Sequence, residues 1–151
     1  MDLSTDKFTV GVFQDVASAE KGIDALVRHN FAPGDLSIIA KQTPEVQALA
    51  ERLFGSAPAV AEVKNLGASV LHGLLVSALD GERRELVAQG IAATAGRAGF
   101  QPHDGVIFER LTARGGVLVG IRSEGRSSEA LSTLHAYGGG NAAIGAWSGR
   151  V

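Results

Sequence analysis

Two stretches decide the fold: FTVGVF, residues 8–13, and GVLVGIRS, residues 116–123. In the first, Phe8 and two valines alternate with other residues at the period of two that is typical of a β-strand. After each stretch comes a segment of helical character and then another short apolar stretch, LSIIAK at 36–41 and NAAIGAW at 141–147. We therefore predict one βαβ unit at each end of the chain.

The residues that open the two expected helices agree with this interpretation. The hydroxyl of Ser18 can cap the first helix and Glu20 adds negative charge to its first turn, while Ser127 and Glu129 do the same in the second unit. We expect the first helix to run to about Asn30. Its apolar positions lie at helical spacing: Ala19, Ile23, Leu26 and Val27.

The two units also match residue by residue at one constant offset. The residues Val10, Gly11, Val12, Asp15, Ser18 and Glu20 correspond to Val119, Gly120, Ile121, Glu124, Ser127 and Glu129. This pattern predicts an internal repeat whose halves are related by an approximate two-fold rotation. Chance is the alternative, because unrelated strand-to-helix units share a serine cap and an acid in the first turn.

Two βαβ units in a small chain predict an α+β fold. They can pair into a ferredoxin-like, four-stranded antiparallel sheet with both helices on one face. A doubly wound parallel sheet is the competitor, and it needs more strands than the sequence offers.

The whole chain, residues 1–151, is expected to form a single domain. It divides into a first βαβ unit at 8–41, a Gly/Ala-rich helical insert at 42–103, and a helix plus the second unit at 104–147. In the insert, Thr43-Pro44-Glu45 predicts a helix start and Gly55 its end. We further expect three helices, at 66–79, 85–99 and 104–114, of which the first two form a hairpin joined at Asp80-Gly81.

Composition excludes several classes of function. The 151 residues contain no cysteine, which excludes disulfides and thiolate sites. With 14 basic and 16 acidic residues, the chain lacks the excess of positive charge that binds nucleic acid. The longest mostly apolar run, 66–79, is shorter than the roughly 20 residues of a membrane span. The first seven residues, MDLSTDK, lack the apolar core of a signal peptide. We therefore expect a cytoplasmic protein that binds no nucleic acid and has no integral membrane segment.

Catalytic and metal-binding motifs are missing from the sequence. It has no phosphate-binding loop, no nucleophile elbow and no zinc-binding helix. The four histidines are more than thirty residues apart, so only the fold could bring them together. His72, within an apolar run, and His103 are the two to watch. We predict no catalytic, cofactor-binding or metal-binding residues.

A stripe of small residues suggests self-association instead. Ala88, Ala92 and Gly96 repeat every four positions and would give the expected 85–99 helix a flat edge. A four-stranded sheet with both helices on one face leaves its other face bare, and a monomer rarely exposes so large an apolar surface. The insert of the same chain or a second copy must cover it. We expect a homo-oligomer, with a dimer favoured.

Longer motifs resemble a known family. TVGVFQDVASAEKGIDAL at 9–26, FAPGDLSIIAK at 31–41, the Gly/Ala-rich centre, and HDGVIFERLTARGG running into VLVGIRS are similar to bacterial general-stress-protein-like domains. The resemblance covers residue 7 to about residue 137 and consists of framework positions. It implies a bacterial protein linked to the stress response, and it brings no catalytic residues that could be carried over.

The leading hypothesis is a non-enzymatic structural or interaction module that self-associates. A small-ligand sensor is the alternative, by analogy with paired ferredoxin-like domains. An enzyme on a dimeric α+β sheet is the lesser alternative, and it would need a buried polar constellation.

Overall fold

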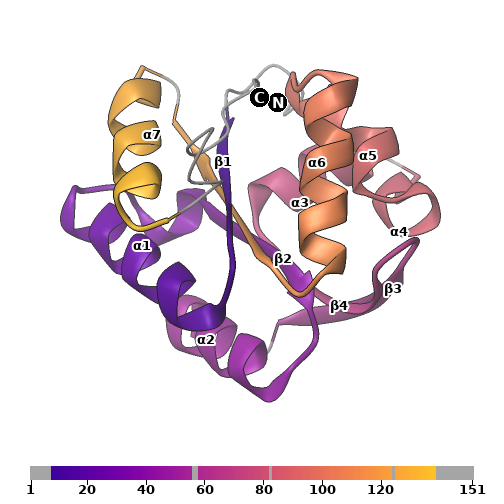
Figure 1. The fold of residues 1–151 in the computed structure, drawn as a ribbon, viewed down its shortest axis with the longest axis horizontal. Coiled ribbons are helices and arrows are strands. Elements are labelled where there is room, and N and C mark those ends of the chain that lie inside the picture. Colours follow the sequence, from indigo (N-terminus) through magenta and orange to yellow (C-terminus); the bar gives the residue numbers. More distant parts are fainter. Residues whose placement is uncertain (1–7, 56–57, 82, 124, 139–151) are drawn as a thin grey trace.

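One antiparallel sheet with helices on both faces forms the protein (Figure 1). The computed structural model describes residues 8–55, 58–81, 83–123 and 125–138. The strands are β1 (Phe8–Phe13), β2 (Leu36–Lys41), β3 (Ala59–Val63), β4 (Gly67–His72) and β5 (Val117–Arg122), in the sheet order β1-β5-β2-β4-β3. The helices are α1 (Val16–Arg28), α2 (Pro44–Phe54), α3 (Leu74–Asp80), α4 (Glu85–Gln89), α5 (Ile91–Thr94), α6 (Pro102–Ala113) and α7 (Ser127–Ala136), with 3-10 turns η2 (Pro33–Asp35) and η3 (Ala95–Ala98). The α+β class is confirmed.

The two predicted repeat strands lie side by side. Val10 of β1 pairs with Gly120 of β5, and Gly11 pairs with Val119. Because the repeat offset relates Val10 to Val119 and Gly11 to Gly120, a rotation about the centre of this ladder carries each pair onto the other. The register therefore fits the expected two-fold relation. The fourth predicted strand, 141–147, lies outside the described residues.

The sheet has five strands in the described part of the chain because the insert is not wholly helical. The prediction of one helix over 66–79 is wrong: β3 and β4 form a hairpin, and α3 begins only after Gly73. Asn65 and Gly67 both adopt a positive φ at the turn, which suits asparagine and glycine. Gly73 has φ +109° and lies so close to β2 that a Cβ there would collide with the backbone of Ser37.

The expected helix over 85–99 is also wrong, since it is divided into α4, α5 and η3. Gly90, with φ +92°, breaks it after α4. The Glu109 carboxylate of α6 lies against Gly90 and accepts a hydrogen bond from the N–H of Ala92, 3.2 Å away, at the start of α5. The Glu109 side chain of α6 thus stabilises the start of α5.

The helix caps confirm one prediction and correct another. The Thr43 hydroxyl accepts a hydrogen bond from the N–H of Val46 (3.1 Å), and α2 ends at Gly55 in the left-handed conformation, both as expected. In α1, however, Asp15 is the cap, because its carboxylate accepts the N–H of Ser18 at 2.8 Å. Ser18 contributes its backbone donor where its hydroxyl was expected to accept.

Apolar cores fill both faces of the sheet. On one face α1, α2 and α7 bury Ile23, Leu49 and Leu134 against β2, β4 and β5. On the other, α3 to α6 bury Leu75, Ile91 and Phe108 against β1, β2 and β5. Figure 1 shows these two groups of helices on opposite sides. The face expected to be bare is therefore covered within the same chain, by α3, α4 and α5 of the insert together with α6.

Candidate functional site

The outer edge of β3 is the more accessible of the two edges of the described sheet, because every residue of β1, the strand at the other edge, is buried. We define the β3 edge as the side of β3 that faces away from β4, and no strand among the described residues pairs with it. Val60 has 44% of its surface exposed and Glu62 is exposed as well. An edge strand of this kind can accept an additional strand.

Two hydrogen bonds establish which backbone groups point outward. The C=O of Val63 accepts the N–H of Leu66 (2.9 Å) within the hairpin, so Val63 is directed toward β4. The N–H of Lys64 donates to the C=O of Val87 in α4 (3.0 Å), so Lys64 is directed away from it. Successive residues of a strand alternate in direction. Val60 and Glu62 therefore present two N–H and two C=O groups on the β3 edge.

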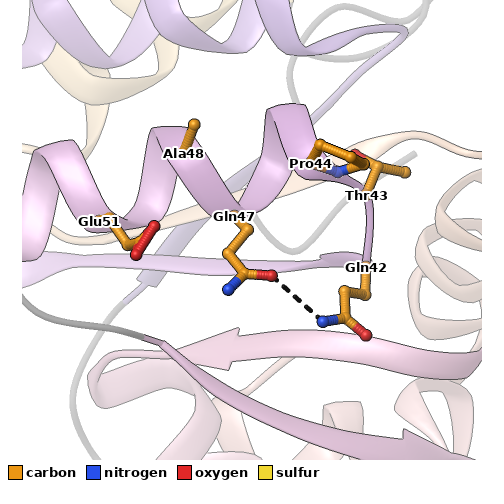
Figure 2. A pocket seen from close by; sticks show the side chains of 6 residues that line it. All are labelled: Gln42, Thr43, Pro44, Gln47, Ala48 and Glu51. Atoms are coloured by element: carbon orange, nitrogen blue, oxygen red, sulfur yellow. Dashed lines mark hydrogen bonds between the residues drawn. The ribbon is translucent and has the colours of Figure 1, made fainter.

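A hollow of about 450 Å³ lies beside the first turns of α2 and is lined by Gln42, Thr43, Pro44, Gln47, Ala48 and Glu51. In Figure 2 the side chains of Gln42 and Gln47 point toward one another, and the amide of Gln42 donates to that of Gln47 at 3.2 Å. Gln42 also donates its backbone N–H to Ala68 in β4 (2.9 Å), and Ala68 pairs with Glu62. Through Ala68, the ladder therefore connects the hollow to the β3 edge.

The lining of the hollow limits its chemistry. Glu51 supplies one carboxylate, and the two glutamines supply amide donors and acceptors. The Thr43 hydroxyl already caps α2. The volume of the hollow falls within the roughly 300–1,000 Å³ of small-molecule sites, and its surface is mostly apolar as in such sites, but it is more open to solvent than they are. Its residues are suited to holding a neutral polar molecule by hydrogen bonds.

The three small residues predicted for self-association lie on separate elements. Ala88 is exposed on α4, beside the Val87 carbonyl that bonds to Lys64. Ala92 is half-buried on α5, where a Cβ added to Gly105 of α6 would stand 3.1 Å from its carbonyl oxygen. Gly96 is exposed in η3. The close helix contact permitted by small residues is thus formed within the chain, between α5 and α6, and Gly105 was not foreseen.

His72 and His103, the two histidines singled out in the sequence, lie on opposite faces of the sheet and do not contact each other. His72 stacks on Phe54 of α2, with ring centroids 3.7 Å apart, and burial lowers the pKa of its imidazole. His103 is exposed in the first turn of α6, which covers the opposite face of the sheet. Within the described ranges, no group of three or more histidine, aspartate or glutamate side chains is placed to hold a metal ion.

Eight polar or charged residues are buried in the described part of the chain. The hydroxyls of Thr9 and Ser123 share a hydrogen bond of 2.7 Å, and Ser127 lies 3.5 Å from Ser123. Asp104 is 1% exposed, and its Oδ2 has no hydrogen-bond partner. Among the described residues, these hydroxyls form no hydrogen bond with a histidine or carboxylate, as activation of a nucleophile would require.

The densest polar cluster has a structural role. The Arg126 guanidinium donates to the carbonyls of His29 (2.5 Å) and Asn30 (3.2 Å), pairs with Glu129 at 2.7 Å and lies 3.8 Å above the Phe31 ring. It thereby links the start of α7 to the end of α1. This contact joins the two repeat units, and it depends on residues about 100 positions apart, so no local pattern predicts it.

None of the described helices is long and apolar enough to cross a membrane. Comparisons of the chain with protein-family models, curated proteins and solved structures find no match.

Proposed function

We propose that the protein is a non-enzymatic interaction module that self-associates through the β3 edge. The observation that supports this function most directly is the set of outward N–H and C=O groups of Val60 and Glu62, which have no strand partner among the described residues. An extended segment added there satisfies these groups and covers Val60. The coverage of both sheet faces within the chain leaves the edge as the better place for association.

Ala88 is the member of the predicted trio that fits this surface. It is exposed on α4 next to Val87, where the free part of the β3 edge ends. A small residue there lets a neighbouring chain approach closely. Ala92 and Gly96 lie farther along the chain on α5 and η3, and Gly96 stays a proposed secondary contact.

Size measurement by light scattering over a concentration series tests the proposal. We expect the wild-type mass to rise from one chain toward two. Val60→Glu should remain at one chain, because a charge on an edge strand opposes pairing and this charge repels the Glu62 carboxylates of two associating copies. Val106→Glu is the matched control, since Val106 on α6 has the same 44% exposure. A wild type that stays at one chain throughout, or a Val60→Glu variant that associates normally, contradicts the proposal.

The hollow beside α2 favours a second candidate function, a small-ligand sensor. Its glutamine amides and the Glu51 carboxylate supply the hydrogen-bonding groups. Native mass spectrometry of the purified protein should then reveal a bound small molecule that is lost in Ala48→Trp, where the indole fills the hollow. A protein without added mass contradicts this candidate.

We also infer a ferredoxin-like arrangement and a cytoplasmic, stress-related role. The sheet neighbours β1, β5 and β2 occur in the order of the first, third and second strands of such a fold, and this order supports the first inference. The resemblance of residues 9–41 and of the second unit to general-stress-protein-like domains supports the second.

A further inference from the structure

We propose that two copies join their β3 strands antiparallel about a two-fold axis at Ala61, so that Val60 of each copy faces Glu62 of the other. This inference rests on the proposed function and specifies its geometry. The outcome is one sheet that continues from the first copy into the second. Isologous contacts of this kind close a dimer and leave no further free edge at the contact.

The backbone makes β3 complementary to itself. Each copy presents the N–H and C=O of Val60 and of Glu62, and in this register every one of the four groups meets a partner of opposite polarity. All five residues of β3 then lie opposite a residue of the other β3, from Ala59 facing Val63 to Val63 facing Ala59. The net charge of −2 per chain is small enough that two copies approach without strong repulsion.

Moving the register by two residues in one direction removes a donor. Val60 would then face its own counterpart, and Glu62 would face Pro58, which has no N–H. The carbonyl of Glu62 would be left without a bond. Only three residues of each β3 would remain opposite the other strand.

Moving it by two residues in the other direction is unfavourable for two reasons. Glu62 would face Glu62, and like charges directly opposite each other destabilise a strand pair. Val60 would face Lys64, whose N–H already donates to Val87. Shifts by a single residue bring inward-pointing groups against outward-pointing ones and form no ladder. The register centred on Ala61 is therefore the favoured one.

The size of the contact predicts a weak dimer. Five residues extend over about 17 Å, so the paired strands alone bury less than the roughly 1,200 Å² of a standard interface. Exposed residues at either end, Ala88 among them, enlarge the contact only modestly. We expect a dissociation constant on the order of 10–100 μM, and association must be measured across that range.

Single cysteines test the register directly because the chain has none of its own. In the proposed dimer Ala61 faces its counterpart in a non-hydrogen-bonded pair, with Cα atoms about 4.5 Å apart, within the disulfide range of about 4.4–6.8 Å. Val60 and Glu62 stand diagonal to their counterparts at about 7–8 Å, outside it. Under mild oxidation at 100 μM, Ala61→Cys should cross-link at least tenfold faster than Val60→Cys or Glu62→Cys.

Ala68→Cys, an exposed position on β4, measures random collision. Circular dichroism verifies that each variant is folded, and light scattering is run on the same samples. Fast cross-linking at Val60 or at Glu62 in place of Ala61 identifies one of the shifted registers and overturns the inference. That outcome leaves the proposed function standing, whereas dimers without cross-linking at any of the three β3 positions also overturn the β3 edge as the site of association. If the wild type keeps the mass of one chain throughout the concentration series, both the inference and the proposed function are overturned. The β3 edge would then be available to a strand of another protein.

Discussion

The backbone N–H of Lys64 donates a hydrogen bond to the C=O of Val87, 3.0 Å away, and this bond closes one end of the β3 edge. At the other end lies Pro58, which has no N–H. Between these limits only Val60 and Glu62 offer free backbone groups. The same contact that fastens α4 to the hairpin thus restricts any added strand to a short stretch centred on Ala61.

Replacing Glu62 with glutamine should tighten the dimer. The two Glu62 carboxylates lie diagonally across the proposed interface at about 7–8 Å, where like charges in water repel by about 0.5 kcal/mol. We expect the dissociation constant of Glu62→Gln to fall about twofold, and added salt to produce a similar tightening in wild type. Analytical ultracentrifugation measures both effects. Glu45→Gln, an exposed site on α2, is the charge-matched control, and a weakened Glu62→Gln dimer would contradict the register.

Strand periodicity predicted the part of the sheet that holds the repeat. The strands β1, β2 and β5 lie where FTVGVF, LSIIAK and GVLVGIRS placed them, and α2 lies where its start signal placed it. The helix predicted at 104–114 is present as α6, which begins earlier, at Pro102. These segments carry their signals locally, in an alternation of apolar residues, a capping threonine or a proline. They can therefore be predicted without knowing which distant residues they contact.

The hairpin was missed because the apolar run at 66–79 is too long for one strand and so favoured a helix. A local signal was nevertheless present, since Asn65 and Gly67 are residues that tolerate positive φ in a tight turn. The division at Gly90 was less accessible, because it depends on Glu109 from a helix distant in sequence. The β3 edge itself depends on strand order, which periodicity does not encode.

Gly73→Ala should destabilise the protein strongly. Gly73 has φ +109°, a conformation that residues with a Cβ rarely adopt, and its close approach to Ser37 leaves no room for a methyl group. We expect a loss of about 3 kcal/mol, from backbone strain and overpacking together. Urea unfolding measures it. Gly34→Ala, which has open space around it, should change stability by less than about 1 kcal/mol, and equal effects at the two sites would refute the explanation.

Asp15→Ala should remove the cap of α1 at a cost of about 1 kcal/mol at neutral pH. The Ser18 N–H bonded to its carboxylate holds the pKa of Asp15 below the ordinary 3.8. A carboxyl group whose pKa is lower in the folded state stabilises the fold at pH values above its pKa in the unfolded chain. This contribution is lost as the pH falls through the pKa of the folded state. The difference between wild type and variant should therefore shrink below about pH 4. Ser18→Ala keeps the backbone donor and should lower the free energy of unfolding by less than Asp15→Ala does. A larger loss in Ser18→Ala would instead indicate that the Ser18 hydroxyl caps α1.

His72 should make stability fall in mildly acidic solution. Burial beside Phe54 lowers the pKa of its imidazole from 6.5, so the unfolded chain binds the proton more readily than the folded one. Stability must then rise with pH through the window just below 6.5, and it is lost as pH falls toward the lowered pKa of the folded state.

His72→Phe keeps a ring against Phe54 but cannot take up a proton, so it should lose less stability than wild type between pH 7.5 and pH 5.5. Urea unfolding at the two pH values measures the loss, and His103→Gln is the control because His103 is exposed. Comparing variants in this way cancels the contributions of the other histidines. If His72→Phe and wild type lose equal stability, protonation of His72 is not coupled to folding, and its stacking on Phe54 does not restrict the charged form.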